Sequence, residues 1–499
     1  MVGGIFHMMS ISTQIYNSLR HFNSVNRKIF FIFILLNLLS ILAALSQPLS
    51  IFVDEGQYLL IAKKMLDGWV PYRDIVENKP LGMYLSLIPA VLLCGRDFVK
   101  LRLFGAFVVS FTSFFIFLIG EKVRDWKAGL LGAVIFILLE AFPGFFGYNL
   151  LSEPMANLFI AAFFYLLISN SSKLSRWMLM GILAASACSI KQTAVFIFIP
   201  LAFVLIRSRR ELRGRFILSF MLGIGVVLLP MLLYLFLNSA LDEAVRWTFF
   251  SLLQLGGSSL QSKLETFFIF SFLFFPFILS SLMSLMNMSE MEKLIWVWLL
   301  SSIIFVQIGY AWFHNYLFVF PAVSLLAAMG LLNSGGVVVK KHIIMRGVSI
   351  TVCLGMMVVF LCEVVMTAWV AEEGRLYKFH ASWWEQEAVS SFIATHTEKG
   401  ERIFVFRNDA EVYYLSERDP VGRMTFFFWD YFASMDENQM REFIFEPLEE
   451  HKPGYVVFNS ADFSAFEKVD NSVAVKRYID EKYEYVMSSG PLEVYRRKA

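Results

Sequence analysis

Charged residues are scarce in this sequence of 499 residues. Asp, Glu, Lys and Arg together make up 17% of the chain, whereas soluble domains average about 25%. Hydrophobic residues make up 57%, and the mean hydropathy is +0.61. The formal net charge of +2 argues against a general binder of nucleic acid or other polyanions. The composition therefore excludes a soluble or disordered chain and predicts an integral membrane protein.

Cysteine is also rare, and no pair of cysteines has the C-x-x-C spacing of a metal or redox site. The four residues are Cys94, Cys188, Cys353 and Cys362, and each lies in an apolar context. We therefore interpret them as buried, inert thiols.

A cleavable signal peptide is not evident either, because the first apolar run is long and lacks a small-residue cleavage site.

The charges that are present are distributed unevenly. Residues 371–499 contain 16 basic and 24 acidic residues, a net charge of −8, whereas residues 1–370 contain 27 and 17, a net charge of +10. This contrast predicts a membrane domain, 1–370, followed by an acidic, water-soluble domain, 371–499.

Eleven apolar segments of residues 1–370 approach or reach the length of about 20 residues that a membrane-spanning helix needs. They lie near residues 28–47, 99–120, 127–144, 152–169, 175–190, 193–207, 214–237, 266–287, 293–309, 315–332 and 343–369. Most Lys and Arg residues fall in alternate loops, as in the run from Arg207 to Arg215, and such loops are typically cytoplasmic. The sequence therefore predicts a multi-pass protein of the cell membrane, with a cytoplasmic N-terminus and an extracytoplasmic C-terminal domain.

Two outward pieces follow from this topology. The first is the long loop 48–98, which predicts two interfacial helices, one over Asp54–Asp67 ending at Gly68 and one beginning at Lys79-Pro80. The second is the C-terminal domain, where a helix near 384–396 and strands near 402–406, 454–458, 484–487 and 492–496 predict a mixed α/β fold.

Asp54 and Glu55 are adjacent carboxylates at the outward end of the first span. Carboxylates beside an apolar wall are costly to desolvate unless they have partners or a chemical role, so they are candidates for a general base. They also suit the first turn of a helix, which is the structural alternative. Lys79 is a candidate phosphate ligand near a helix start, and the alternative is a lysine that extends toward lipid head groups.

Other candidate site residues are spread along the chain but share the predicted outward face. Glu153 begins the fourth span within Ser152-Glu153-Pro154, a good helix start in its own right. Lys191 lies between two short spans and offers a second cation. His314 and Tyr316 lie at the outward end of the tenth span, where aromatic residues are also ordinary members of an interfacial belt. Their shared placement makes them a candidate site.

The order of these motifs resembles the polytopic GT-C glycosyltransferases, the broad group that contains protein O-mannosyltransferases and lipid A aminoarabinose transferases. The resemblance covers roughly residues 28–335. It is carried by Asp54-Glu55, Tyr58, Ala62, the Gly68…Pro71-Tyr72 turn, Lys79-Pro80, Ser152-Glu153-Pro154-Met155, His314-Asn315-Tyr316, Pro321 and the outward terminal domain. It implies an α-helical polytopic membrane protein of about 11 transmembrane helices, with a C-terminal soluble α/β domain.

The resemblance also implies an activity. A sugar would pass, with inversion, from a polyprenyl-phosphate donor to a hydroxyl acceptor on the outer face of the membrane. Asp54 resembles the catalytic carboxylate, with Glu55 beside it, and Lys79 matches the lysine of a Lys-Pro-Pro motif that contacts the donor phosphate, although Leu81 replaces the second proline. His314 and Tyr316 resemble the pair at the phosphate end of the pocket. The remaining candidates for substrate binding are Tyr58, Glu153 and Lys191.

The implied partners are a lipid-linked sugar, an acceptor that is a lipid, a glycan or a protein hydroxyl, and membrane lipid, with no nucleic acid. We expect no cofactor, and a divalent metal is not favoured, because the sequence has no additional acidic pair placed to decide for one.

Two alternatives from other functional classes remain open. A transporter of lipid or glycan would use ionisable residues near the middle of the membrane, and Glu140 and Glu363 come closest to that position. A receptor or scaffold would use the acidic domain to bind a partner. Within that domain, Arg407-Asn408-Asp409 follows a strand and is interpreted as structural. We also hypothesise that the domain recognises the acceptor.

Overall fold

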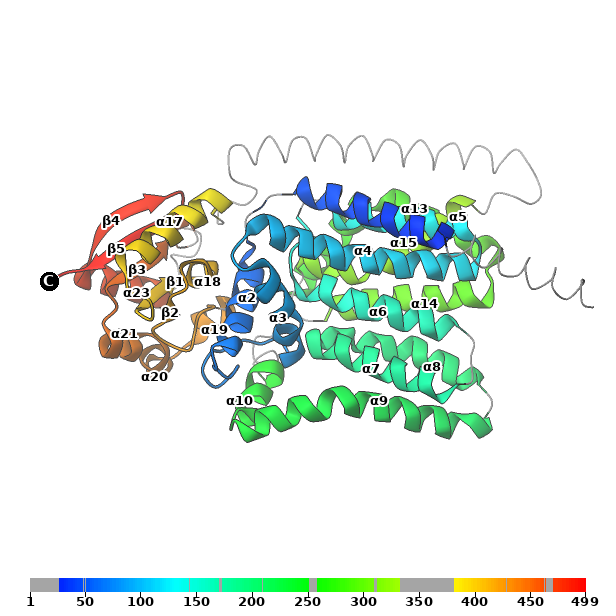
Figure 1. The fold of residues 1–499 in the computed structure, drawn as a ribbon, viewed down its shortest axis with the longest axis horizontal. Coiled ribbons are helices and arrows are strands. Elements are labelled where there is room, and N and C mark those ends of the chain that lie inside the picture. Colours follow the sequence, from blue (N-terminus) through cyan, green and yellow to red (C-terminus); the bar gives the residue numbers. More distant parts are fainter. Residues whose placement is uncertain are drawn as a thin grey trace, which may run out of the picture.

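A computed structural model describes residues 27–47, 49, 51–142, 144–169, 173–208, 210–250, 258–308, 312–332, 381–427, 429–461, 463 and 470–499. Figure 1 shows a long helical bundle with a smaller domain of helices and strands at one of its ends. The predicted span 343–369 lies outside the described residues. The two architectures agree with the predicted membrane and α/β parts.

The first ten predicted spans correspond to helices of the bundle. These are Arg27–Leu45, α4 (Phe98–Val123), α5 (Trp126–Glu140), α6 (Ser152–Ile168), α7 (Leu174–Ile190), η1 (Gln192–Ile197) with α8 (Phe198–Arg207), α9 (Arg210–Leu237), α12 (Leu260–Leu273) with α13 (Phe275–Met283), α14 (Glu290–Val306), and η4 (Phe313–Phe318) with α15 (Phe320–Leu332). Among the described residues, Arg27–Leu45, Phe98–Val123 and Arg213–Leu237 are each long and apolar enough to cross a bilayer alone. Several of the others are shorter apolar helices of 10–17 residues.

One predicted span is broken. The chain bends by 74° between α12 and α13, so the continuous helix predicted over 266–287 is wrong in this detail. Pro276 lies in the first turn of α13. Proline has no N–H to donate to the preceding turn, so it begins a new helix more readily than it continues an old one.

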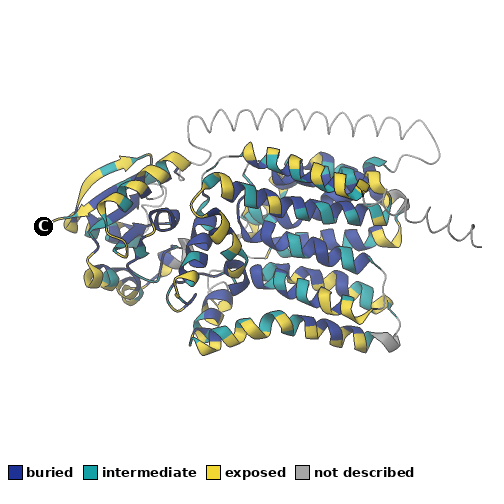
Figure 2. Cartoon of the chain, viewed as in Figure 1, coloured by how far each residue is buried: buried dark blue, intermediate teal, exposed yellow. Residues whose placement is uncertain are grey.

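Small residues allow the bundle helices to approach closely. A Cβ atom on Gly181 of α7 would lie 2.0 Å from the carbonyl oxygen of Phe220 in α9, and one on Gly223 of α9 would lie 2.0 Å from that of Met178. Such glycine contacts are typical of helix packing in membranes. On the other side, α9 exposes apolar side chains such as Leu218 and Leu229 (Figure 2), as expected for a helix that faces lipid.

The first outward loop contains the two predicted helices, α2 (Val53–Leu66) and α3 (Leu81–Cys94). Gly68, with φ at 91°, follows α2, and Pro80 is the N-cap of α3. The helix α2 is enclosed by the protein, because every residue from Glu55 to Ala62 is buried; its place at the membrane interface stays a prediction. The helix lies between the bundle and the C-terminal domain (Figure 1), so both of its faces are covered.

The C-terminal domain is a mixed sheet covered by helices. Its strands are β1 (Arg402–Phe406), β2 (Asp419–Pro420), β3 (Tyr455–Asn459), β4 (Tyr483–Ser489) and β5 (Leu492–Arg497). The spatial order is β2-β1-β3-β5-β4, in which β2, β1 and β3 are parallel and β5 and β4 antiparallel. The helices are α17 (Trp383–His396), α18 (Glu411–Ser416), α19 (Trp429–Ser434), α20 (Glu437–Met440), η5 (Arg441–Phe445), α21 (Glu446–His451) and α23 (Asp470–Lys482). All four predicted strands are confirmed, and β2 has only two residues.

Candidate functional site

Asp54 and Glu55 occupy the first turn of α2, and their side chains have different partners. Neighbouring residues of a helix project about 100° apart, so the two carboxylates face different surroundings. The half-buried Asp54 carboxylate accepts a hydrogen bond from the Tyr58 hydroxyl, one turn later, at 3.2 Å. Glu55 is fully buried.

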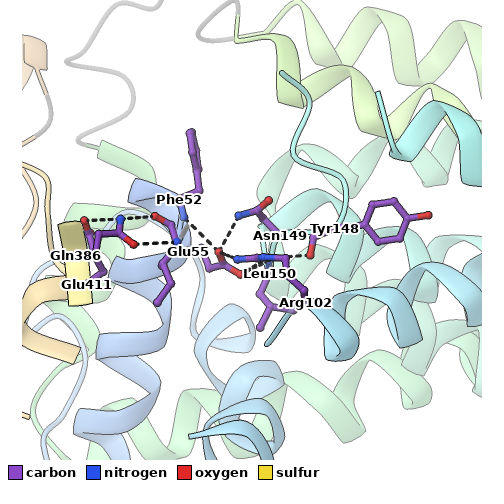
Figure 3. Close-up of polar contacts among 9 residues, drawn as sticks. Phe52, Glu55, Arg102, Tyr148, Asn149, Leu150, Gln386 and Glu411 are labelled. Carbon is purple, nitrogen blue, oxygen red and sulfur yellow. Dashed lines mark hydrogen bonds and ion pairs between the residues drawn. The ribbon is translucent and has the colours of Figure 1, made fainter. Parts of the chain in front are cut away.

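Glu55 forms a buried ion pair with Arg102 of α4, and both side chains are 0% exposed. The arginine donates from Nη2 to Oε2 at 2.5 Å and from Nη1 to Oε1 at 3.0 Å. The same carboxylate accepts from Asn149 Nδ2 and from the Leu150 N–H, each at 2.8 Å, and Arg102 Nη1 also donates to the Tyr148 carbonyl (Figure 3). This geometry favours a role for Glu55 in fixing the start of α2 against α4; the catalytic assignment made with Asp54 stays a prediction.

Lys79 is held by its main chain, while its ammonium group reaches Tyr58. The Lys79 carbonyl accepts from the Tyr72 hydroxyl at 2.8 Å and from the Tyr84 hydroxyl at 3.2 Å. Its Nζ donates to Asn78 Oδ1 at 2.8 Å and lies 5.6 Å from the centre of the Tyr58 ring. Because Tyr58 also bonds Asp54, this tyrosine joins the predicted base to the predicted phosphate ligand.

Three further predicted residues meet beside this pair. Lys191, at the C-cap of α7, forms an ion pair with Glu153 at the start of α6, and its Nζ also donates to Asn315 Oδ1 at 2.6 Å. His314 in η4 has its Nε2 atom 3.7 Å from Glu153 Oε1. The charges of Asp54 and Lys79 act electrostatically on both Lys191 and His314. The structure therefore brings Glu153, Lys191 and His314, from three separate chain segments, into one ionic cluster.

Tyr316 is placed differently from the other predicted residues. Its hydroxyl accepts from Gln307 Nε2 at 2.6 Å, and its ring stacks on Phe270 with the centroids 4.1 Å apart. The side chain is buried between α12 and α14. A direct role at the phosphate stays a prediction.

Glu77 is a buried carboxyl that the sequence pattern did not single out. Burial is the largest influence on it and raises the pKa of Glu77 to about 7; Lys79 opposes this rise, and the Asp54 carboxylate adds to it. Its Oε1 accepts from the Asn78 N–H at 2.7 Å. In the sequence, Glu77 could have been found by its position two residues before the candidate phosphate ligand Lys79.

Arg102 was also missed, although a signal for it exists in the sequence. An arginine inside an apolar span is expensive unless it is paired, and such residues mark functional or structural networks. Gln192 is a third omission: its Nε2 donates to the Asn78 carbonyl at 2.8 Å and to the Thr248 carbonyl at 3.0 Å. It thus fixes the Lys79 segment to the bundle.

No family model matches the sequence, and no curated protein sequence matches at a significant level. Solved structures do match. ArnT from Cupriavidus metallidurans, bound to undecaprenyl phosphate, superposes with a TM-score of 0.66 at 12% identity, over 94% of this chain and 98% of that chain. The archaeal oligosaccharyltransferase AglB from Archaeoglobus fulgidus, in complex with an inhibitory peptide and a dolichol-phosphate, gives a TM-score of 0.52 at 10% identity, over 94% and 74%.

The chain has the GT-C fold. The match extends over nearly the whole chain, so it includes the C-terminal domain as well as the bundle. The predicted fold class is therefore confirmed. At identities of 10–12% the likeness concerns the GT-C fold alone, and the site must be argued from the residues of this chain.

Within the described ranges, no group of three or more His, Cys, Asp or Glu residues is arranged to hold a metal ion. The expectation that the GT-C site works without metal stays a prediction.

Proposed function

We propose that this chain is a membrane glycosyltransferase that moves a sugar from a polyprenyl-phosphate donor to a hydroxyl acceptor on the extracytoplasmic face. The observation that carries the proposal is the Asp54–Tyr58–Lys79 arrangement, in which a half-buried carboxylate and an ammonium group both approach the same tyrosine. Group transfer from a phosphate needs both: a base for the acceptor and a cation for the leaving group.

The reaction is written as a single displacement. The acceptor oxygen attacks the anomeric carbon from the face opposite the phosphate, a new C–O bond forms, and the bond from that carbon to the phosphate oxygen breaks. The hydroxyl proton passes to Asp54, and the electron pair leaves on the lipid phosphate, where Lys79 stabilises the negative charge. Attack from the opposite face inverts the anomeric configuration.

The neighbouring ion pair has a separate role. Glu153 already neutralises Lys191, so this pair anchors α6 to the junction of α7 and η1 and adds less net charge than Lys79. His314, half-buried at the edge of the pair, supplies a ring nitrogen for a sugar hydroxyl or a phosphate oxygen. Tyr58 orients Asp54, and its ring supports the donor beside Lys79.

The structural neighbours support a lipid-linked donor. ArnT is described with undecaprenyl phosphate and AglB with a dolichol-phosphate, and both share the GT-C fold with this chain. A structure of the Archaeoglobus fulgidus oligosaccharyltransferase tethered with an acceptor peptide, with a TM-score of 0.53 at 12% identity over 95% of this chain and 74% of that one, illustrates an acceptor on the same fold. For this chain the proposal extends to a lipid, glycan or protein hydroxyl.

The test uses the purified protein in lipid, with a panel of polyprenyl-phosphate sugars and with crude membranes as a source of acceptor. We expect wild type to release free polyprenyl phosphate and Asp54→Asn to release it at least about 100-fold more slowly, within the usual contribution of a general base. Asp67→Asn is the matched control, because Asp67 is a partly exposed carboxylate at the C-cap of the same helix. Equal rates for wild type and Asp54→Asn would show that another group is the base.

No release with any donor would contradict the proposal and favour the transporter. In that case a flux assay in sealed vesicles, with Glu140→Gln as the variant, is the next measurement, because Glu140 is a buried carboxyl of α5.

A further inference from the structure

The C-terminal domain forms hydrogen bonds with the main chain immediately before Asp54. Gln386 of α17 is 1% exposed, and its side-chain amide bonds both main-chain groups of Ile51, three residues ahead of Asp54. Its Oε1 accepts from the Ile51 N–H at 3.1 Å, and its Nε2 donates to the Ile51 carbonyl at 3.0 Å (Figure 3). The same Nε2 donates to Glu411 Oε1 at 3.1 Å. A paired amide contact of this kind fixes both the position and the direction of the main chain.

Helix α18 packs against α2 directly behind Asp54. A Cβ atom on Gly56 would lie 2.9 Å from the Glu411 backbone nitrogen and 3.0 Å from its Cβ. Real Cβ atoms do not approach backbone so closely, so the domain approaches to a distance that only glycine permits at this position. The C-terminal domain and the catalytic helix thus form one packed unit.

A second set of contacts reaches the Lys79 segment. Thr425 donates from Oγ1 to Gln57 Oε1 at 2.9 Å, and both residues are 0% exposed. Gln57 Nε2 in turn donates to the Val76 carbonyl at 3.4 Å, and the Val76 N–H donates to the Arg423 carbonyl at 2.8 Å. The domain therefore forms hydrogen bonds with both chain segments that carry the candidate site. One segment leads into Asp54 and the other leads into Lys79.

Helix α2 needs this support. It has 14 residues and its N-cap, Phe52, provides no side-chain cap, and isolated helices of this length are marginal in water. The C-terminal domain contacts the side of the helix that carries Gly56 and Gln57. A displacement of about 1 Å at reacting groups can reduce a rate by about 100-fold, so the orientation of α2 matters for the chemistry.

We propose that the C-terminal domain is a positioning part of the active centre. In this proposal Gln386 and Thr425 fix the relative positions of the two chain segments that carry Asp54 and Lys79. This inference rests on the proposed glycosyltransferase function and deepens it. It gives the domain a role in donor activation, which is separate from the acceptor recognition expected from the sequence. The two roles differ in what happens to donor hydrolysis when acceptor is absent.

The experiment compares full-length Gln386→Ala and Thr425→Val with wild type in lipid, with Thr425→Ser as the variant that keeps the hydroxyl and Gln439→Ala as a control elsewhere in the domain. Three quantities are measured: polyprenyl phosphate released in water without acceptor, release with crude membranes, and hydrogen exchange of segments 51–58 and 72–80. We expect Gln386→Ala and Thr425→Val to raise exchange in these segments and to slow both reactions by the same factor, about 10- to 100-fold. Thr425→Ser and Gln439→Ala should resemble wild type.

Several results would overturn the inference. If hydrolysis is unchanged and only transfer falls, the domain serves the acceptor. If rates and exchange are unchanged in both variants, the contacts do not position the site. Should Gln386→Ala fail to fold, the near-isosteric Thr425→Val and its Thr425→Ser partner still decide the matter. Failure of the proposed function looks different, because then wild type itself releases nothing from any donor, and the inference falls with it.

Discussion

The adjacent acidic residues Asp54 and Glu55, in the first turn of α2, have different partners. Glu55 is paired with Arg102 out of contact with water, while the half-buried Asp54 accepts a hydrogen bond from a neutral tyrosine hydroxyl. Both oxygens of Glu55 already accept hydrogen bonds from neighbouring side chains and main chain, so they are not free to take a proton from an acceptor. The structure thus favours Asp54 for the chemistry on grounds that adjacency in the sequence cannot supply.

The buried pair makes the first prediction. Arg102→Met should lower the free energy of unfolding by about 3–5 kcal/mol, because it leaves the Glu55 charge buried without its partner. The double variant Arg102→Met with Glu55→Leu should recover much of this loss, because no charge then remains in the interior. Chemical unfolding in mixed micelles measures both. A single variant as stable as wild type would show that the pair is not a structural anchor.

Glu77 makes the second prediction. Burial raises its pKa from 4.5 to about 7, so between these values the folded protein holds a proton that the unfolded chain has released. Stability from this proton is fully present below about pH 4.5 and is lost as the pH rises through about 7. Glu77→Gln should flatten the fall in unfolding free energy across this window, measured by unfolding at pH 4.5, 6 and 7.5. An unchanged pH profile would contradict the raised pKa.

At the scale of elements, composition was enough to locate the helices, because a run of apolar residues as long as a bilayer is thick has few other structures available. A helix break at Pro276 could have been predicted from the sequence, because proline favours the start of a helix. The 74° angle between the two helices could not. The burial of α2 was unpredictable for a physical reason. One face packs on the bundle and the other on Glu411 and its neighbours, which lie more than 300 residues further along the chain.

The site shows the same limit. The sequence identified Asp54, Lys79, Glu153, Lys191 and His314 separately, by residue type and by topology. Their contacts depend on helix packing, so the sequence did not predict that Tyr58 bridges Asp54 and Lys79 or that Lys191 pairs with Glu153. Arg102 was missed because its partner lies 47 residues away.

The contact between α4 and the loop before α6 makes the third prediction. A Cβ on Gly105 would lie 2.2 Å from the Tyr148 carbonyl oxygen, which also accepts from Arg102. Gly105→Ala should therefore lower the free energy of unfolding by about 1–3 kcal/mol, as for an overpacked core. It should also slow the release of polyprenyl phosphate.

Gly214→Ala is the matched control for Gly105→Ala. A Cβ atom on Gly214 of α9 would meet nothing within 4 Å, so alanine there should be neutral or stabilising by up to about 1 kcal/mol through helix propensity. Equal effects of the two substitutions on the melting temperature would refute the close contact.

At the scale of the whole molecule, the basic loops and the C-terminal domain occupy opposite ends of the bundle. The junction of α4 and α5, where Lys127 lies in the first turn of α5, is at one end, and the domain is at the other end beside α2 (Figure 1). Lys and Arg favour the cytoplasmic side, so we propose that the domain faces outward. In a background without the native cysteines, a membrane-impermeant maleimide should label Lys399→Cys in intact cells and should not label Lys127→Cys. The reverse pattern would invert the topology and move the reaction to the cytoplasm.

The cations near Asp54 make the fifth prediction. Lys79 already supplies positive charge where we propose that the phosphate leaves, so we expect a chelator such as EDTA to leave the rate of polyprenyl phosphate release unchanged. Lys79→Met should slow release in either condition. Loss of activity in EDTA that is restored by a divalent cation would show instead that a metal takes part.

The contact between Ile51 and Gln386 joins residues 335 positions apart. At roughly 5–20 residues per second, a ribosome needs about 20–70 s to synthesise the chain between them. During that interval the first loop has left the ribosome, but the residues that hold it have not. The contacts from Gln386 to the segment before Asp54 therefore form only after most of the bundle has been synthesised, and a chain that stops before residue 386 lacks them.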